Sequence, residues 1–358
     1  MSSVWNNRIS VSMFGEAHGP AIGVTVDNLP AGEYIDADVL SGFMARRYMC
    51  GDASVNSMPH IMSGILNDRT TGSPLCAFLP NSDVSAPQHE ESDNLVRPGH
   101  ADYTGAVRYK GFNDVRGGGH LSDRLTAPLC FAGAVCAQIL ERRGIYTGAH
   151  ILQIHDIKDN PFDPVNITRD GIISIRSKGF PVINDRKGWE MTEDINKAHE
   201  CGESLGGVIE CAAVNVPAGI GSPVFDGLEN NIAQLVFGIP GVKGIEFGSG
   251  FTSAKMVGSQ NNDEFYVNDH GHVLTKTNNH GGIISGISSG MPITLRVAVK
   301  PSEYISGSQN AVDYRNMTSE TAEAERNIPC TVPAVVPCVE AAVNIALLSH
   351  MLDYPNFC

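Results

Sequence analysis

One stretch of thirty residues, 97–126, concentrates side chains that could do chemistry. It carries five basic residues, three aspartates and two histidines, so its local charge is +2 in a chain of net charge −14. A cationic pocket in an acidic protein favours a small, strongly anionic ligand, because the remaining surface would repel nucleic acid. The charged and titratable residues of the stretch are Arg97, His100, Asp102, Arg108, Lys110, Asp114, Arg116, His120, Asp123 and Arg124.

Three consecutive glycines, Gly117, Gly118 and Gly119, stand near the end of this stretch, ahead of a predicted helix. A glycine-rich turn before a helix allows backbone N–H groups to close on phosphate or carboxylate oxygens. A surface loop with flexible glycines is the alternative. The two histidines and five basic residues beside the triplet favour a ligand site.

Two histidines are candidate general acids. His18 lies in GEAHG, a turn that follows a predicted strand, and His100 lies in RPGHADY, two residues before Asp102. An imidazole exchanges protons near neutral pH, and strand-end loops often carry catalytic groups. Taken alone, His18 is more simply a surface or core histidine. No P-loop or Gly-x-Gly-x-x-Gly pattern is present, which removes support for ATP use and Rossmann nucleotide binding.

The composition, 42% apolar and 18% charged over 358 residues, is that of a soluble globular protein with a substantial core. No apolar run is long enough for a membrane span, and the first residues do not form a signal peptide. The nine cysteines are scattered without a CxxC pair, which predicts a reduced, cytoplasmic protein. No metal site is expected; His270 and His272 are more simply a solvated turn.

Alternation and helical periodicity predict strands and helices interspersed without a regular βαβ period. We therefore expect one mixed α+β domain over residues 1–358, with sheets packed on helices. The strands are predicted at 8–14, 22–26, 61–66, 74–79, 150–154, 205–216, 241–250 and 294–299. The helices are predicted at 36–47, 126–143, 194–202, 230–237 and from Pro337 onward. Arg46 and Arg47 end the first helix, where on local grounds they would neutralise its dipole.

Taken in order, the motifs resemble those of the chorismate synthase family over essentially the whole chain. The matching stretches are FGEAHG, MARR, TTGSP, RPGHADYTG, GFNDVRGGG, GVKGIEFGSGF, NNHGGIISGISSGMPI and RNIPCTVPAVVP. The resemblance implies a β-α-β sandwich and a homotetramer. It implies the 1,4-anti elimination of phosphate from 5-enolpyruvylshikimate 3-phosphate, giving chorismate, with reduced FMN and no net redox change. Bifunctional members also bind NADPH.

The resemblance also implies roles for individual residues. His18 matches the acid beside the leaving phosphate, and His100 matches the histidine that contacts reduced flavin. Forked arginine contacts suit a substrate with one phosphate and two carboxylates; the matching arginines are Arg46, Arg47, Arg97, Arg124 and Arg326. The flavin contacts would be His120, Leu121, Ser122, Ser285, Lys300, Pro301, Ser302, Glu303, Tyr304 and Arg326. Arg47 matches the NADPH position of bifunctional members.

The chain departs from the family pattern at several of these places. Ile328 stands where the family has the Asp that takes a proton beside the flavin, and isoleucine cannot take one. The segment 48–60 is shorter than the family loop and lacks its arginines, and Glu303 puts a carboxylate near the expected FMN phosphate. Two alternatives to the standard lyase therefore stay open. One is a paralogue that binds FMN but acts on another anionic ring compound, and the other is a non-catalytic flavin-binding relative.

Overall fold

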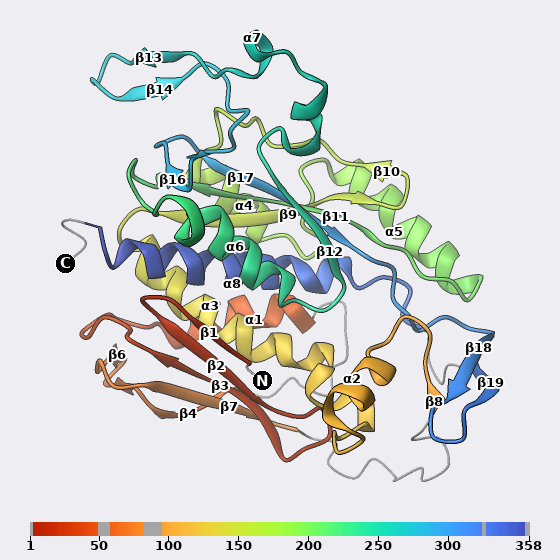
Figure 1. Ribbon diagram of the computed structural model, residues 1–358. Coiled ribbons are helices and arrows are strands. Elements are labelled where there is room, and N and C mark those ends of the chain that lie inside the picture. The colour runs from red at the N-terminus through yellow and green to blue at the C-terminus, as the bar shows by residue number, and fades with distance from the viewer. Residues whose placement is uncertain (1–2, 49–57, 82–94, 324–326, 355–358) are drawn as a thin grey trace.

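The computed structural model describes residues 3–48, 58–81, 95–323 and 327–354. Two five-stranded antiparallel sheets enclose a layer of helices, as Figure 1 shows. This β-α-β arrangement is the fold class expected from the sequence. Each sheet turns an apolar face toward the same helices, so one hydrophobic core lies on both sides of the helical layer.

The first sheet has the strand order β1-β2-β3-β7-β4. Its strands are β1 (Val4–Asn6), β2 (Ser10–Gly15), β3 (Ala21–Asp27), β7 (Leu75–Pro80) and β4 (His60–Ser63). Alternate residues of β7 are buried, which is the pattern that predicted this strand. The predicted strand 61–66 is instead β4 followed by β5 (Ile65–Leu66). Gly64 separates them with a φ of +90°, and its backbone lies against Leu75 too closely for a side chain.

The second sheet has the strand order β10-β9-β11-β17-β12. Its strands are β10 (Ile157–Lys158), β9 (Tyr146–Ile154), β11 (Gly207–Val214), β17 (Ile293–Val299) and β12 (Val242–Phe247). Two helices, α4 (Arg169–Arg176) and α5 (Asp185–Glu200), accompany β9 and β10. The sequence prediction missed α4 and started α5 nine residues late. Their N-caps, Thr168 and Asn184, lie in polar sequence that looked like loop.

The helical layer consists of α1 (Ala37–Tyr48), α3 (Thr126–Glu141), α6 (Leu228–Phe237) and α8 (Val332–Met351). Gly133 of α3 allows a close crossing with α8, because a Cβ at this position would lie 2.3 Å from Ala341 Cα. The predicted start of α8 at Pro337 was wrong. Pro333 occupies the first turn, and Pro337 lies inside the helix. Within the described residues α8 alone is long and apolar enough to cross a membrane, and 94% of it is buried as a core helix.

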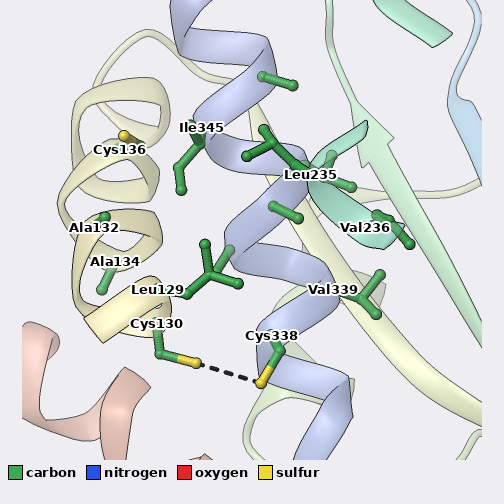
Figure 2. Packing of buried hydrophobic residues seen from close by; sticks show 14 of the residues in the cluster. Leu129, Cys130, Ala132, Ala134, Cys136, Leu235, Val236, Cys338, Val339 and Ile345 are labelled. Carbon is green, nitrogen blue, oxygen red and sulfur yellow. Dashed lines mark hydrogen bonds between the residues drawn. The ribbon is translucent and has the colours of Figure 1, made fainter. Parts of the chain in front are cut away.

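The contact between α3 and α8 is shown in Figure 2, where Cys130 of α3 faces Cys338 of α8. The Cys130 thiol donates a weak hydrogen bond to Cys338 Sγ at 3.7 Å. Most of the described cysteines are buried, and all the described ones are free thiols. Burial raises the pKa of the Cys136 thiol to about 12, so this side chain behaves as a small apolar group.

The remaining elements are short and lie around these layers. They are β6 (Arg69–Thr70), β8 (Leu95–Val96), α2 (Asp102–Tyr109), η2 (Arg116–Leu121), η3 (Asp123–Leu125), η4 (Val224–Asp226), η5 (Gly250–Lys255), α7 (Gly258–Asn261), β13 (Phe265–Val267), β14 (Val273–Thr275), β15 (Ile283–Ile284), β16 (Ile287–Ser288), β18 (Ser308–Asp313) and β19 (Thr318–Glu323). The strands β18 and β19 form a small sheet with β8, next to α2 at the lower right of Figure 1.

A buried histidine links β9 to β11. His150 is fully buried, with its Nε2 3.0 Å from Glu210 Oε2 and its Nδ1 3.4 Å from Asp159 Oδ2. Burial alone would lower the pKa of His150, but the hydrogen bonds and charges of the two carboxylates outweigh it, and the net shift is upward. The folded protein therefore holds this proton more tightly than the unfolded chain does.

We expect this group to make stability depend on pH. A histidine whose pKa is raised by folding stabilises the folded protein. The stabilisation is fully present below the ordinary histidine pKa of about 6.5, and it is lost as the pH rises through the pKa of the folded state. Urea unfolding at a series of pH values should show this decline, at no more than about 1.4 kcal/mol per pH unit. In His150→Gln the decline should flatten, whereas His155→Gln, which changes an exposed histidine, should keep it. Equal slopes in His150→Gln and the parent would contradict the assignment.

Candidate active site

The glycine triplet lies in η2 with a backbone that side chains rarely permit. The φ angles are +56° at Gly117, +85° at Gly118 and +56° at Gly119. A Cβ at Gly119 would lie 2.0 Å from the Asp114 carbonyl oxygen, and the Gly119 carbonyl accepts a hydrogen bond from Ala17 N at 3.0 Å. The loop is therefore fixed against the turn that follows β2. Because η3 stands between the triplet and α3, these glycines do not form the N-terminus of that helix.

The two candidate acids, His18 and His100, each lie against one glycine of this loop, and the two glycines are consecutive. A Cβ at Gly117 would lie 2.6 Å from His18 Nε2, and a Cβ at Gly118 would lie 3.1 Å from His100 Nε2. The absence of side chains at these glycines lets both imidazole rings approach the backbone. Two histidines from distant parts of the sequence are thus brought to one small region.

His100 is surrounded by polar groups from three segments. Arg97 forms a fork on Asp102, with Nε 2.7 Å from Oδ2 and Nη2 2.9 Å from Oδ1, and its Nη1 donates to the Tyr304 hydroxyl at 2.9 Å. The His100 and Tyr304 rings lie edge to face, 6.4 Å apart. Burial raises the pKa of Asp102, but hydrogen bonds from Arg97 and His100 outweigh it and hold that pKa far below its usual range.

The predicted flavin segment 300–304 lies beside the same histidine. Gly99, next to His100, would place a Cβ 3.2 Å from Glu303 Cβ, and Lys300 Nζ contacts Glu303 Oε2 at 2.5 Å. Glu303 is therefore neutralised by its own neighbour. Ser302 is buried, with its hydroxyl accepting from Tyr304 N at 3.2 Å, and Pro301 packs near Gly206.

Of the predicted substrate arginines, Arg124 lies beside His18 and Arg47 lies at the start of α3. Arg124 Nη1 donates to the Ala17 carbonyl at 2.9 Å, which places its charge next to His18. Arg47 is 8% exposed and holds the start of α3, with Nε 2.6 Å from Thr126 Oγ1 and Nη2 2.9 Å from the Asp123 carbonyl oxygen. Its predicted contacts with substrate or NADPH stay predictions.

Arg46 is engaged away from the histidines. Its Nη1 and Nη2 lie 2.6 and 2.7 Å from the two oxygens of Glu340, which is fully buried in α8. Glu340 Oε1 also accepts from Ala149 N at 2.8 Å. The pair joins α1, α8 and β9, so the geometry gives Arg46 a role in the scaffold, and its substrate contact stays a prediction.

A pocket of about 370 Å³ lies beside the triplet, with Gly118, His120 and Leu121 in its wall. The aromatic rings of Phe14, Tyr109 and Phe112 also line it, together with Met13, Glu16, Asn113 and Asp114. Asp114 is paired with Arg116 at 2.9 and 2.7 Å. The sequence reasoning did not single out the three aromatic residues; Phe14 inside FGEAHG was the available signal.

His120 fixes this pocket to the N-terminal strands. Its Nδ1 lies 2.7 Å from the Gly15 carbonyl oxygen and its Nε2 lies 2.5 Å from Ser3 Oγ. Leu121 lies under Gly105 of α2. Ser122 is buried, and its hydroxyl accepts from Arg124 N at 3.4 Å. Ser122 thus caps η3, and its predicted flavin contact stays a prediction.

One further predicted position, Ser285, lies away from this cluster. Ser285 lies in the hairpin between β15 and β16, at the upper left of Figure 1, whereas α2 lies at the lower right. Arg326 lies outside the described residues. Ile328 is close, because its N–H donates to the Tyr304 carbonyl at 3.0 Å, but it offers only an apolar side chain there.

Comparisons with known proteins find one family across nearly the whole chain. The family model for chorismate synthase matches residues 9–352. Chorismate synthase of Thermococcus kodakarensis is 39% identical over 350 residues, which is 96% of both chains. That of Lancefieldella parvula is 38% identical over 373 residues, covering 99% of this chain and 98% of the relative.

A crystal structure of chorismate synthase superposes with a TM-score of 0.77 at 28% identity, covering 97% of this chain and 93% of that chain. The resemblance noted in the motifs is therefore confirmed over nearly the full length, and so is the β-α-β fold. The chain belongs to the chorismate synthase family, the lyases that form chorismate from a phosphate-bearing substrate in the shikimate pathway.

Proposed function

We propose that the chain carries out the 1,4-anti elimination of phosphate from 5-enolpyruvylshikimate 3-phosphate with reduced FMN. The observation that supports this best is the approach of His18 and His100 to successive glycines of one loop, flanked by Arg124 and Arg97. Two imidazoles and two guanidiniums suit a reaction in which a dianionic phosphate leaves and charge must be stabilised.

The residues present fit a flavin. The pocket beside Gly118 is bounded by flat rings of Phe14, Tyr109 and Phe112, which suit a planar aromatic ligand. His120 and Leu121 are its predicted contacts in this wall. When bound, reduced FMN supplies negative charge to the allylic system of the substrate and recovers it within the turnover.

The chain's own residues would bind and exchange protons. Arg124, held by the Ala17 carbonyl, gives His18 a cationic neighbour at which the leaving phosphate can be bound. His18 would donate a proton to that phosphate as the bond breaks. Arg97 is fixed by Asp102 and Tyr304 and places a second positive charge near His100.

Ile328 favours a second candidate, a paralogue that binds FMN and acts on a different anionic ring compound. This position lies beside Tyr304 and cannot accept a proton. Loss of one positioned base typically costs about 10²–10⁴-fold in rate. An Ile328→Asp variant that gains lyase activity would indicate a weakened standard enzyme, and no gain would favour the paralogue or the non-catalytic relative.

The proposed function is tested anaerobically with purified protein, photoreduced FMN and 5-enolpyruvylshikimate 3-phosphate. Chorismate absorbance and phosphate release should rise together in equal amounts. FMN binding without product would reject the standard reaction and direct the search to other anionic ring substrates. If FMN does not bind, the flavin premise fails for both enzyme candidates.

We also propose that the protein is a cytoplasmic homotetramer. It binds small anionic ligands and binds neither nucleic acid nor membranes. If the chain reduces its own flavin, Arg47 contacts NADPH. The distance of the Ser285 hairpin from α2 in one chain supports assembly, because a neighbouring subunit could bring that hairpin to the flavin. Sedimentation with and without FMN would measure the assembly, and NADPH oxidation with FMN would measure the reductase activity.

A further inference from the structure

We propose that Asp102 is a positioning residue that fixes the tautomer of His100 and directs its Nε2 toward the glycine loop; this rests on the function proposed for His100. His100 Nδ1 lies 2.5 Å from Asp102 Oδ1, and the His100 side chain is 8% exposed. A nitrogen this close to a carboxylate oxygen carries the hydrogen and donates it.

The position of Arg97 is consistent with this assignment. Its Nη2 lies 3.2 Å from His100 Nδ1 and 3.4 Å from Nε2. An atom almost equally far from both ring nitrogens cannot lie along the in-plane lone pair of either. Arg97 therefore lies over the imidazole face, and Asp102 Oδ1, 2.5 Å from Nδ1, is the nearest of these polar atoms to a ring nitrogen. With Nδ1 committed, Nε2 is the atom that lies against Gly118.

Asp102 is itself held from several directions. Its Oδ2 accepts from Arg97 N at 3.1 Å and Nε at 2.7 Å, and its Oδ1 accepts from Arg97 Nη2 at 2.9 Å. The other charged or titratable groups facing this corner are Tyr304, bonded to Arg97, and the pair of Lys300 with Glu303 beside Gly99. The Asp102 carboxylate thus accepts three hydrogen bonds from Arg97 and makes one contact with His100.

The geometry makes Asp102→Asn a sharp test. The single amide oxygen would take the Oδ2 place, where two Arg97 donors converge, and the amide NH₂ would take the Oδ1 place facing His100 Nδ1. A donor facing Nδ1 reverses the neutral tautomer and opposes the imidazolium. In turnover we expect kcat/KM to fall by up to about 10⁴-fold, the loss that follows when a catalytic histidine is held in the wrong tautomer. The pH–rate limb contributed by His100 should move to lower pH.

The matched controls separate positioning from damage to the fold. Asp102→Glu keeps a carboxylate and should restore part of the activity and the pH profile. Glu33→Gln removes a carboxylate paired with Arg142 and Arg143, outside the cluster around His100, and should leave the profile unchanged. A loss of kcat/KM in Asp102→Asn without movement of the pH limb would assign Asp102 a merely structural role.

A second measurement does not depend on turnover. Diethyl pyrocarbonate acylates unprotonated imidazole, and peptide mass spectrometry measures the reaction rate at His100 as a function of pH. The midpoint should move to lower pH in Asp102→Asn and stay in place in Glu33→Gln. An unmoved midpoint would overturn the proposal even if chorismate is formed, whereas a moved midpoint without chorismate formation would leave it standing and reject the lyase assignment.

Discussion

Replacing Glu340 with glutamine is expected to lower the free energy of unfolding by about 3–5 kcal/mol. The glutamine amide would present a donor to the Arg46 guanidinium, which now finds two carboxylate oxygens at 2.6 and 2.7 Å. Arg46 would keep a buried charge without its counter-ion. In the parent protein burial lowers the pKa of Arg46, but the charge and hydrogen bonds of Glu340 outweigh it and raise that pKa. Without Glu340 this support is lost, yet an arginine guanidinium is not deprotonated in proteins, so the variant keeps the buried charge.

Urea unfolding of Glu340→Gln tests this prediction, and two further variants serve as comparisons. Glu33→Gln breaks a more exposed pair and should cost no more than about 1 kcal/mol. Adding Arg46→Met to Glu340→Gln should recover part of the loss, because the buried charge is then gone. If Glu340→Gln costs no more than Glu33→Gln, the pair does not hold the layers together.

Replacing His18 with alanine is expected to reduce kcat about 10²–10⁴-fold, the usual effect of losing a general acid. The phosphate would then leave without a proton from the residue beside Gly117 and Arg124. Anaerobic turnover with reduced FMN measures the effect. FMN affinity should stay the same, since His18 is assigned to the phosphate.

His155→Ala serves as the control, because this histidine is exposed and pairs with Asp194. It should leave kcat unchanged. A drop of less than 10-fold in His18→Ala would reassign the leaving-group acid to another residue. Equal losses in both variants would point to damage to the fold.

Much of the fold follows from local sequence. The alternation of apolar residues predicted β7, and the helical stripe of apolar residues predicted α3, each to within two residues. The strand β7 buries one face, and α3 is buried on all sides, so both segments carry a clear apolar pattern. The start of β9 at Tyr146 was not predicted, because Gly148 has low strand propensity. This glycine is buried only through a long-range contact, since Ile172 of α4 covers it. Pro337 was taken for a helix start because a proline inside a helix is rare.

The site depended on long-range contacts that no local pattern contains. His18 reaches the loop that His100 also approaches because the turn after β2 is bound to Gly119 through Ala17 N. The family resemblance supplied their roles, and the structure supplies their proximity. The pairing of Arg46 with Glu340 had a signal that local reasoning did not use, since a lone glutamate in the apolar α8 requires a cation. Dipole neutralisation had seemed sufficient for Arg46.

The same ion pair constrains how the chain folds during synthesis. Arg46 and Glu340 are 294 residues apart, and Ile9 N in the N-terminal region donates to Ser349 Oγ, 340 residues away. The helices α1 and α3 therefore leave the ribosome long before α8, against which they pack, has been made. Until then the apolar faces that they turn toward α8 stay exposed, and the nascent chain is open to aggregation. Its folding should complete after translation and should benefit from a chaperone that covers these helix faces.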